Sequence, residues 1–233
     1  GRELAFELRN PTTFFQVTTR DHVTMDGWMI RPARFDSTKK YPVLFYVYGE
    51  PAACTVKDEF SPNPWFQQLA DMGYVIISVD NRGTPAPKGR AWRKAILKKI
   101  GVINIHDQAM AATEILKWPW VDNSRIAVWG WSGGGSSTQN LMFQYPDIYQ
   151  TGIAVAGVSN LLYYDNIYEE RYMGLLPGDL KYYQAGSSVN HVKGLRGNLL
   201  IIHGSGDDNV HYQNQEALIN ALVSAGKQFS MME

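Results

Sequence analysis

A single cysteine, a net charge of zero and the absence of long apolar runs narrow the classes of protein that this sequence encodes. Cys54 has no second cysteine to join, and no activating pattern surrounds it, so it fits a small loop residue better than a catalytic thiol. Basic and acidic residues number 22 each, which leaves no field to attract nucleic acid or an acidic membrane surface. No apolar run approaches the about 20 residues of a transmembrane helix. We therefore expect no nucleic-acid partner and no membrane segment.

Length and the two ends of the sequence bear on domain organisation. The 233 residues, 45% of them hydrophobic, suffice for one α/β domain with a single core. Residues 1–6 do not form a cleavable signal, and residues 228–233 begin a strand pattern without a following turn. We expect residues 1–233 to be one domain cut from a longer chain at both ends.

Two kinds of strand pattern follow one another along the chain. The early segments have the composition of antiparallel strands, and they cover residues 14–18, 27–30 and 43–48. Later apolar strands alternate with helical patterns; the strands cover residues 74–80, 125–129, 152–156 and 199–203, and the helices residues 64–72, 105–117, 136–145 and 214–225. This order predicts a mainly parallel sheet with antiparallel N-terminal strands and helices on both faces. Residues 84–100 and 160–192 are too long for simple connectors and are expected to shape a binding cleft.

The most specific motif is GWSGG at residues 130–134, which follows a predicted strand and precedes a predicted helix. A serine between glycines at such a turn is held on a strained, exposed corner close to helix N-terminal amides. Ser132 is therefore the candidate nucleophile for acyl transfer. The alternative is a glycine-rich turn that only ends a strand.

A serine nucleophile needs a base and an acid that orients the base. Asp207 follows the strand at residues 199–203, at the sheet edge where Ser132 is expected, and is the candidate acid. The alternative is that Asp207 and Asp208 cap the next helix.

No histidine of this sequence fits the role of the base that Ser132 needs. His211 lies only four residues after Asp207, and the other histidines precede it; they are His22, His106, His191 and His203. We expect these to be packed or capping residues and the base to lie beyond Glu233. The fragment alone is then expected to be inactive.

Three segments together resemble the dipeptidyl peptidase IV branch of the prolyl oligopeptidase family of serine peptidases. They are GWS at residues 130–132, YYDNIYEERYMG at residues 163–174 and HGSGDDNVH at residues 203–211. The resemblance extends from about Phe14 to the last residue. It implies an α/β-hydrolase fold, truncated at the C-terminus, with Ser132 as nucleophile and Asp207 as acid. It also implies an N-terminal β-propeller that this chain does not contain.

The same resemblance assigns the remaining site residues. Tyr48 and the Gly133 amide would donate hydrogen bonds to the oxyanion, which is a large source of transition-state stabilisation. An apolar pocket for a proline ring would be lined by Tyr164, Tyr168, Val158 and Val210, and Asn209 would bind a substrate carbonyl. Spacing alone favours the other interpretation of Tyr48, an aromatic residue at a strand end that packs under the sheet.

The sequence departs from the family pattern at two positions. Gly133 stands where the family usually has tyrosine, and Leu161 where it has tryptophan, so we expect an enlarged cavity and a looser preference for proline. The family's glutamates that bind the substrate amine lie in the propeller. Glu169 and Glu170 are expected to be solvated charges.

The resemblance predicts an exopeptidase that releases N-terminal dipeptides or tripeptides, after proline or alanine, without a cofactor. Peptide is the expected substrate, a homodimer is expected from relatives, and the location suggested is periplasmic or extracytoplasmic. Three alternatives remain open: an esterase of the same fold, a non-catalytic binding module, and a metal site formed by His203, Asp207, Asp208 and His211, whose spacing matches no established zinc pattern.

Overall fold

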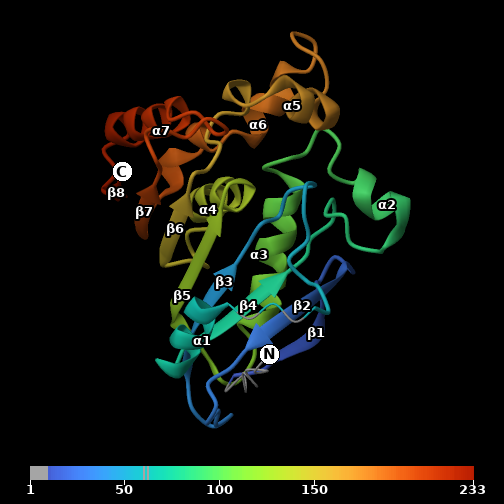
Figure 1. The fold of residues 1–233 in the computed structure, drawn as a ribbon, viewed down its shortest axis with the longest axis vertical. Helices are drawn as coiled ribbons and strands as arrows, with labels where there is room; N and C mark the ends of the chain where they lie inside the picture. The colour runs from blue at the N-terminus through green and yellow to red at the C-terminus, as the bar shows by residue number, and fades with distance from the viewer. Residues whose placement is uncertain (1–9, 60, 62) are drawn as a thin grey trace, which may run out of the picture.

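The computed structural model describes residues 10–59, 61 and 63–233. Their architecture is one eight-stranded sheet in the order β1-β2-β4-β3-β5-β6-β7-β8, covered by helices (Figure 1). This is the α/β-hydrolase arrangement expected from the sequence. No helix within the described ranges is long and apolar enough to cross a membrane.

The N-terminal edge of the sheet is antiparallel, as predicted. Strands β1 (Thr12–Thr18) and β2 (Thr24–Ile30) form a hairpin in which Phe14 pairs with Trp28. Strand β2 then pairs antiparallel with β4 (Val75–Val79).

From β4 onward every neighbouring pair of strands is parallel. The strands are β3 (Tyr41–Tyr46), β5 (Val121–Trp131), β6 (Thr151–Val155), β7 (Asn198–Ile202) and β8 (Ser230–Met232). Since parallel strands end at one edge, the loops that follow β3, β5 and β7 gather at the same end of the sheet.

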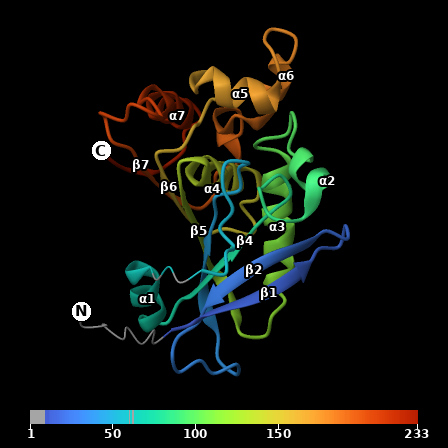
Figure 2. The same cartoon turned by 45° about the vertical axis from the view of Figure 1, so that its right-hand side comes forward.

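Helices cover both faces, and strand alternation decides which side chain meets which helix. In β4, Val75 and Ile77 join the core under α3 (Ile103–Ile115), α4 (Gly133–Gln144) and α7 (Gln213–Ser224). Ile76, between them, packs instead with Phe66 of α1 (Pro64–Asp71). Figure 2 shows α1 and α3 on opposite sides of the strands.

The two long irregular regions lie together beyond the carboxyl ends of the strands (Figure 1). The first contains α2 (Gly89–Lys94). The second contains α5 (Asn166–Met173), α6 (Leu180–Gly186) and three short 3₁₀ turns, η1 (Leu161–Tyr163), η2 (Ser188–Asn190) and η3 (Val192–Gly194). The Lys98 amide donates to the Tyr172 carbonyl at 2.7 Å, which joins the two regions.

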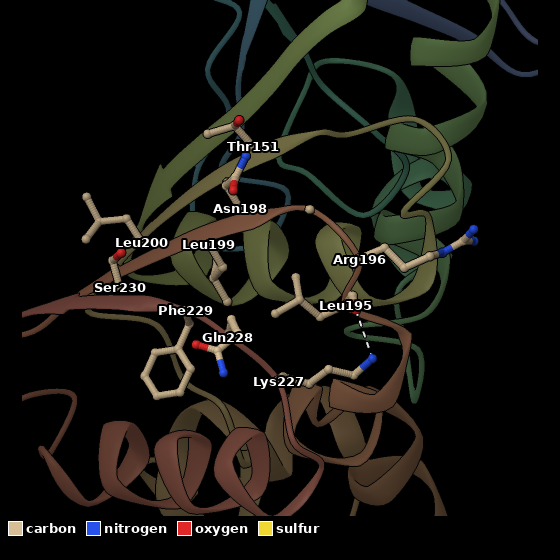
Figure 3. A pocket seen from close by; sticks show the side chains of 12 residues that line it. Thr151, Leu195, Arg196, Asn198, Leu199, Leu200, Lys227, Gln228, Phe229 and Ser230 are labelled. Carbon is tan, nitrogen blue, oxygen red and sulfur yellow. Dashed lines mark hydrogen bonds between the residues drawn. The ribbon is translucent and has the colours of Figure 1, made fainter.

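A cavity of about 490 Å³ lies at the opposite, amino-terminal edge of the sheet (Figure 3). Thr151 and Asn198, the first residues of β6 and β7, line it together with Lys227, whose Nζ donates a 2.9 Å hydrogen bond to the Leu195 carbonyl. It is therefore separate from the loops that carry the candidate catalytic residues.

Candidate active site

Ser132 occupies the sharp turn between β5 and α4. Its φ of 57° and ψ of −121° lie in a region that non-glycine residues rarely adopt. The turn is fixed by two hydrogen bonds, from the Ser132 amide to the Val155 carbonyl at 2.9 Å and from the Ser136 amide to the Ser132 carbonyl at 3.0 Å. This backbone presents the half-buried serine at the start of a helix, as the motif predicts.

The flanking glycines are required by the close approach of Val47, the residue that follows β3. A Cβ on Gly130 or Gly134 would collide with the Val47 carbonyl oxygen. The same proximity places Tyr48, the next residue, against the turn: a Cβ at position 134 would lie 3.4 Å from the Tyr48 Cα.

Asp207 lies in the loop after β7. Because β5, β6 and β7 are parallel, this loop lies at the same sheet edge as Ser132, and β6 alone separates β5 from β7. Its Oδ1 accepts hydrogen bonds from the amides of Asn209 at 3.0 Å and Val210 at 2.9 Å. These bonds fix the carboxylate in a tight turn. Helix α7 has Tyr212 as its N-cap without a side-chain cap, so Asp207 does not cap that helix.

The histidines contact groups other than the Ser132 hydroxyl or are exposed to solvent. The buried His203 has its Nε2 2.7 Å from the Val210 carbonyl and 3.4 Å from Asp207 Oδ2. His106 and His191 contact Asp21 and the Ala185 carbonyl, and His211 is exposed. Within the described part of the chain, no hydrogen bond joins the Ser132 hydroxyl to a histidine.

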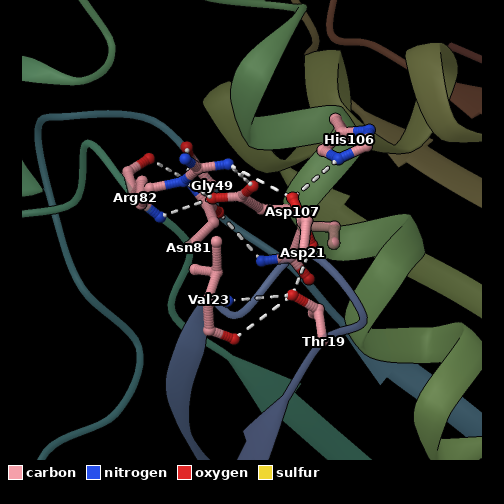
Figure 4. Close-up of polar contacts among 9 residues, drawn as sticks. Thr19, Asp21, Val23, Gly49, Asn81, Arg82, His106 and Asp107 are labelled. Carbon is pink, nitrogen blue, oxygen red and sulfur yellow. Dashed lines mark hydrogen bonds and ion pairs between the residues drawn. The ribbon is translucent and has the colours of Figure 1, made fainter.

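Tyr48 belongs to a loop that is held from two sides. Ser137 Oγ donates to the Tyr48 carbonyl at 2.8 Å. Asn81 Nδ2 donates to the Gly49 carbonyl at 2.9 Å (Figure 4). Burial, and secondarily the nearby Glu50 carboxyl, raise the pKa of Tyr48, so its hydroxyl stays protonated and can donate. Gly133 is the first residue of α4, where a backbone amide has no intrahelical acceptor.

The residues assigned to the substrate pocket form one hydrophobic cluster. Val158 and Val210 are buried in it, and Tyr164 and Tyr168 pack against it with their rings 5.5 Å apart, edge to face. Leu161 belongs to the same cluster. The Tyr164 hydroxyl donates to Asn209 Oδ1 at 3.0 Å, which turns the amide so that its Nδ2 remains available to donate.

Glu169 was expected to be solvated, and this expectation is wrong. Glu169 is only 3% exposed, on the face of α5 that also buries Met173 four residues later. Burial, then the charges of Glu50 and Asp165, raise its pKa to about 9. Glu170 is exposed, as expected. The i, i+4 spacing puts Glu169 on the same face of α5 as Met173, and it is the packing of that face that buries it.

Glu50 is the site residue that sequence reasoning missed. It is 6% exposed, and its Oε2 accepts a 2.7 Å hydrogen bond from the Tyr168 hydroxyl. Its carboxyl group also lies against Gly133, so the missing side chain at position 133 does not leave that space empty. No motif in the sequence marks this contact.

Comparison with known proteins decides the family. The model of the prolyl oligopeptidase family matches residues 60–233, about three quarters of the chain and all of the elements from α1 onward. The chain belongs to the prolyl oligopeptidase family.

Relatives named as peptidases are similar across nearly the whole chain. A probable dipeptidyl-aminopeptidase B of Arthroderma otae is 40% identical over 212 residues, which cover 88% of this chain and 23% of that protein. The prolyl endopeptidase FAP of Mus musculus is 41% identical over 239 residues, covering 100% of this chain and 31% of that protein. The chain thus spans between about a quarter and a third of the length of these relatives.

Solved structures agree with the fold. The crystal structure of Porphyromonas gingivalis dipeptidyl peptidase 4 superposes with a TM-score of 0.92 at 39% identity, covering 96% of this chain and 31% of that one. A putative dipeptidyl aminopeptidase IV from Bacteroides ovatus gives a TM-score of 0.91 at 32% identity, covering 95% and 32%. The α/β-hydrolase fold predicted from the sequence is therefore confirmed.

Proposed function

We propose that this chain is the catalytic domain of a serine exopeptidase that releases N-terminal dipeptides, or tripeptides, from peptides with proline or alanine before the scissile bond. The observation that carries the proposal is the placement of Ser132, on a strained turn at the carboxyl edge of the sheet, with Asp207 fixed at the same edge. The names of the relatives as dipeptidyl peptidases support the substrate class.

In the proposed reaction, Ser132 Oγ attacks the substrate carbonyl and passes its proton to a histidine oriented by Asp207. The Tyr48 hydroxyl and the Gly133 amide donate hydrogen bonds to the oxyanion. The cluster around Val158, Val210 and the two tyrosines holds the rigid, apolar proline ring, which has no amide hydrogen to satisfy.

We propose that the base is a histidine outside residues 1–233. His203 is occupied by the Val210 carbonyl, and the remaining histidines lack a contact with Ser132 or Asp207 within the described part of the chain. The relatives are three to four times as long, which leaves ample room for such a segment and for a propeller. Residues 1–233 alone are then expected to be inactive.

The test compares two kinds of substrate with the full-length protein. We expect higher kcat/KM for an X-Pro p-nitroanilide with a free N-terminus than for the same substrate with an acetylated N-terminus. We expect Ser132→Ala to lower kcat at least about 10⁴-fold, as loss of a triad nucleophile does in other serine peptidases. Ser224→Ala, an exposed serine at the end of α7, is the control and should have no effect.

Two outcomes would contradict the proposal. Turnover of p-nitrophenyl esters without turnover of X-Pro amides would favour the esterase alternative. Retention of peptidase activity by Ser132→Ala would exclude this serine as the nucleophile.

We also propose, from the resemblance to the dipeptidyl peptidase IV branch, that the full-length protein forms a homodimer in the periplasm or another extracytoplasmic compartment. Sedimentation of the purified protein and fractionation of the source cells test these two points separately. A monomer, or recovery with cytosolic markers, would contradict them.

A further inference from the structure

Glu50 joins three parts of the candidate active site. It follows β3 in the loop that carries Tyr48, its Oε2 accepts from the Tyr168 hydroxyl of α5 at 2.7 Å, and its carboxyl group lies against Gly133 at the start of α4. At 6% exposure it is one of the most buried acidic side chains of the described residues.

The Glu50 side chain crowds the space that a side chain at position 133 would occupy. A Cβ there would lie 2.9 Å from Glu50 Cδ, 3.0 Å from Oε2 and 3.1 Å from Cγ, all closer than Cβ contacts normally are. Because Glu50 is buried and its loop is tied to Asn81 and Ser137, its side chain cannot withdraw freely. A side chain at 133 and a glutamate at 50 thus compete for one space.

The contact with Tyr168 fixes one wall of the proposed proline pocket. The Tyr168 ring packs edge to face on Tyr164 at 5.5 Å and on Tyr172 at 5.0 Å, but the hydrogen bond to Glu50 is what holds its hydroxyl. Loss of that acceptor would leave the hydroxyl of the half-buried Tyr168 without this partner, which costs free energy and loosens the ring.

We propose that Glu50 is a positioning residue of this active site: it takes the place of a side chain at position 133 and holds Tyr168 beside the nucleophile, which couples the pocket wall to the oxyanion-binding loop. This inference rests on the proposed function and adds a residue that the assigned site does not contain.

The charge of Glu50 gives its proposed role a measurable consequence, a dependence of activity on pH. Burial raises the pKa of Glu50 to about 7, although the Tyr168 hydrogen bond opposes the rise. The titratable groups that face it are Tyr48 on its own loop, Tyr164 beyond η1, and Tyr168 and Glu169 on α5; no basic group contributes to its pKa. Above pH 7 a carboxylate therefore forms beside Tyr48 and Gly133, where it opposes the developing oxyanion.

The first experiment measures kcat/KM against pH with an X-Pro amide for the full-length protein. We expect wild-type activity to fall roughly tenfold between pH 7 and pH 9 as Glu50 ionises. Glu50→Gln, which keeps the shape and an acceptor for Tyr168, should show no such fall. Glu170→Gln removes an exposed carboxylate from α5 and should follow the wild type.

The second experiment tests the competition for space. Gly133→Ala should lower kcat/KM roughly tenfold in the wild type, and less than about threefold in the Glu50→Gly background, because neighbours that compete for space are not additive. Equal losses in both backgrounds would overturn the proposal.

Labelling by a fluorophosphonate separates the possible failures. If the wild type neither reacts nor turns over, the proposed function is wrong. If it does both, while Gly133→Ala costs the same in the wild type and in the Glu50→Gly background, the positioning role of Glu50 is wrong and the proposed function stands.

Discussion

Two groups of acidic side chains lie near the carboxyl ends of the strands, and they differ in whether a cation accompanies them. In one, the buried Asp107 receives two side-chain hydrogen bonds from Arg82, at 2.9 and 2.6 Å, and the Arg82 amide donates a third at 3.0 Å. Asp21 lies 3.9 Å from the same guanidinium (Figure 4). In the other, Glu50 and Glu169 are buried with tyrosines and without a salt bridge among the described residues.

The two groups differ in role: the paired group supports the structure, and the unpaired group bears on the chemistry of the candidate site. The paired group joins the end of β4 to α3 and, through Asn81, supports the loop that carries Tyr48. Of the unpaired carboxyls, Glu50 lies against Gly133, the residue after the candidate nucleophile. The raised pKa values of Glu50 and Glu169 make the charge of this group depend on pH. Carboxyl groups with strongly perturbed pKa values cluster at functional sites.

The largest expected effect comes from breaking the paired group. Arg82→Ala should lower the free energy of unfolding by about 3–5 kcal/mol, because Asp107 is then a buried charge without a partner. Denaturant unfolding of the full-length protein measures this. Arg125→Ala removes an exposed arginine that pairs with Asp122 at 2.7 Å, and it should shift the midpoint far less. Equal shifts for the two variants would contradict the structural role of the Arg82 pair.

A smaller effect is expected from the unpaired group. The folded protein keeps a proton on Glu169 up to its pKa of about 9, whereas the unfolded chain releases it near 4.5, so stability falls as pH rises between these values. At pH 7 the cost is about 3 kcal/mol. Glu169→Gln should therefore gain stability relative to the wild type as pH rises from 5 to 9.

Thermal unfolding at several pH values measures that gain. Glu170→Gln, the exposed neighbour, should show a Tm difference that does not change with pH. A constant difference for Glu169→Gln as well would mean that the Glu169 carboxyl is not held protonated.

Much of the fold was predictable because its determinants are local. Glycines at 130 and 134, a strand before and a helix after define the turn at Ser132 without knowledge of the rest of the chain. Helix α4 begins at Gly133 rather than near the predicted Ser136, and Ser132 is its N-cap. The low helix propensity of glycine obscured this start in the sequence.

The second irregular region was recognised, but its helices were not. Asp165 caps α5 by accepting from the Tyr168 amide at 2.8 Å, a start signal present in the sequence. The short α6 and the 3₁₀ turns depend on packing over the sheet and have no strong periodic pattern of their own.

Glu50 could not be predicted, because its contacts are not local. Tyr168 is 118 positions away, and Gly133 reaches it only through the parallel pairing of β3 with β5. The placement of Tyr48, Tyr164 and Asn209 in one site came from family resemblance rather than from spacing. Their assigned roles stay predictions.

We propose that Ser132 is an activated nucleophile served by Asp207. Its most direct test is reaction of the full-length protein with a fluorophosphonate, followed by mass spectrometry of the proteolytic fragments. We expect one adduct, on Ser132, whose rate of formation falls by several orders of magnitude in Asp207→Asn. An adduct on another residue, or an undiminished rate in that variant, would contradict it.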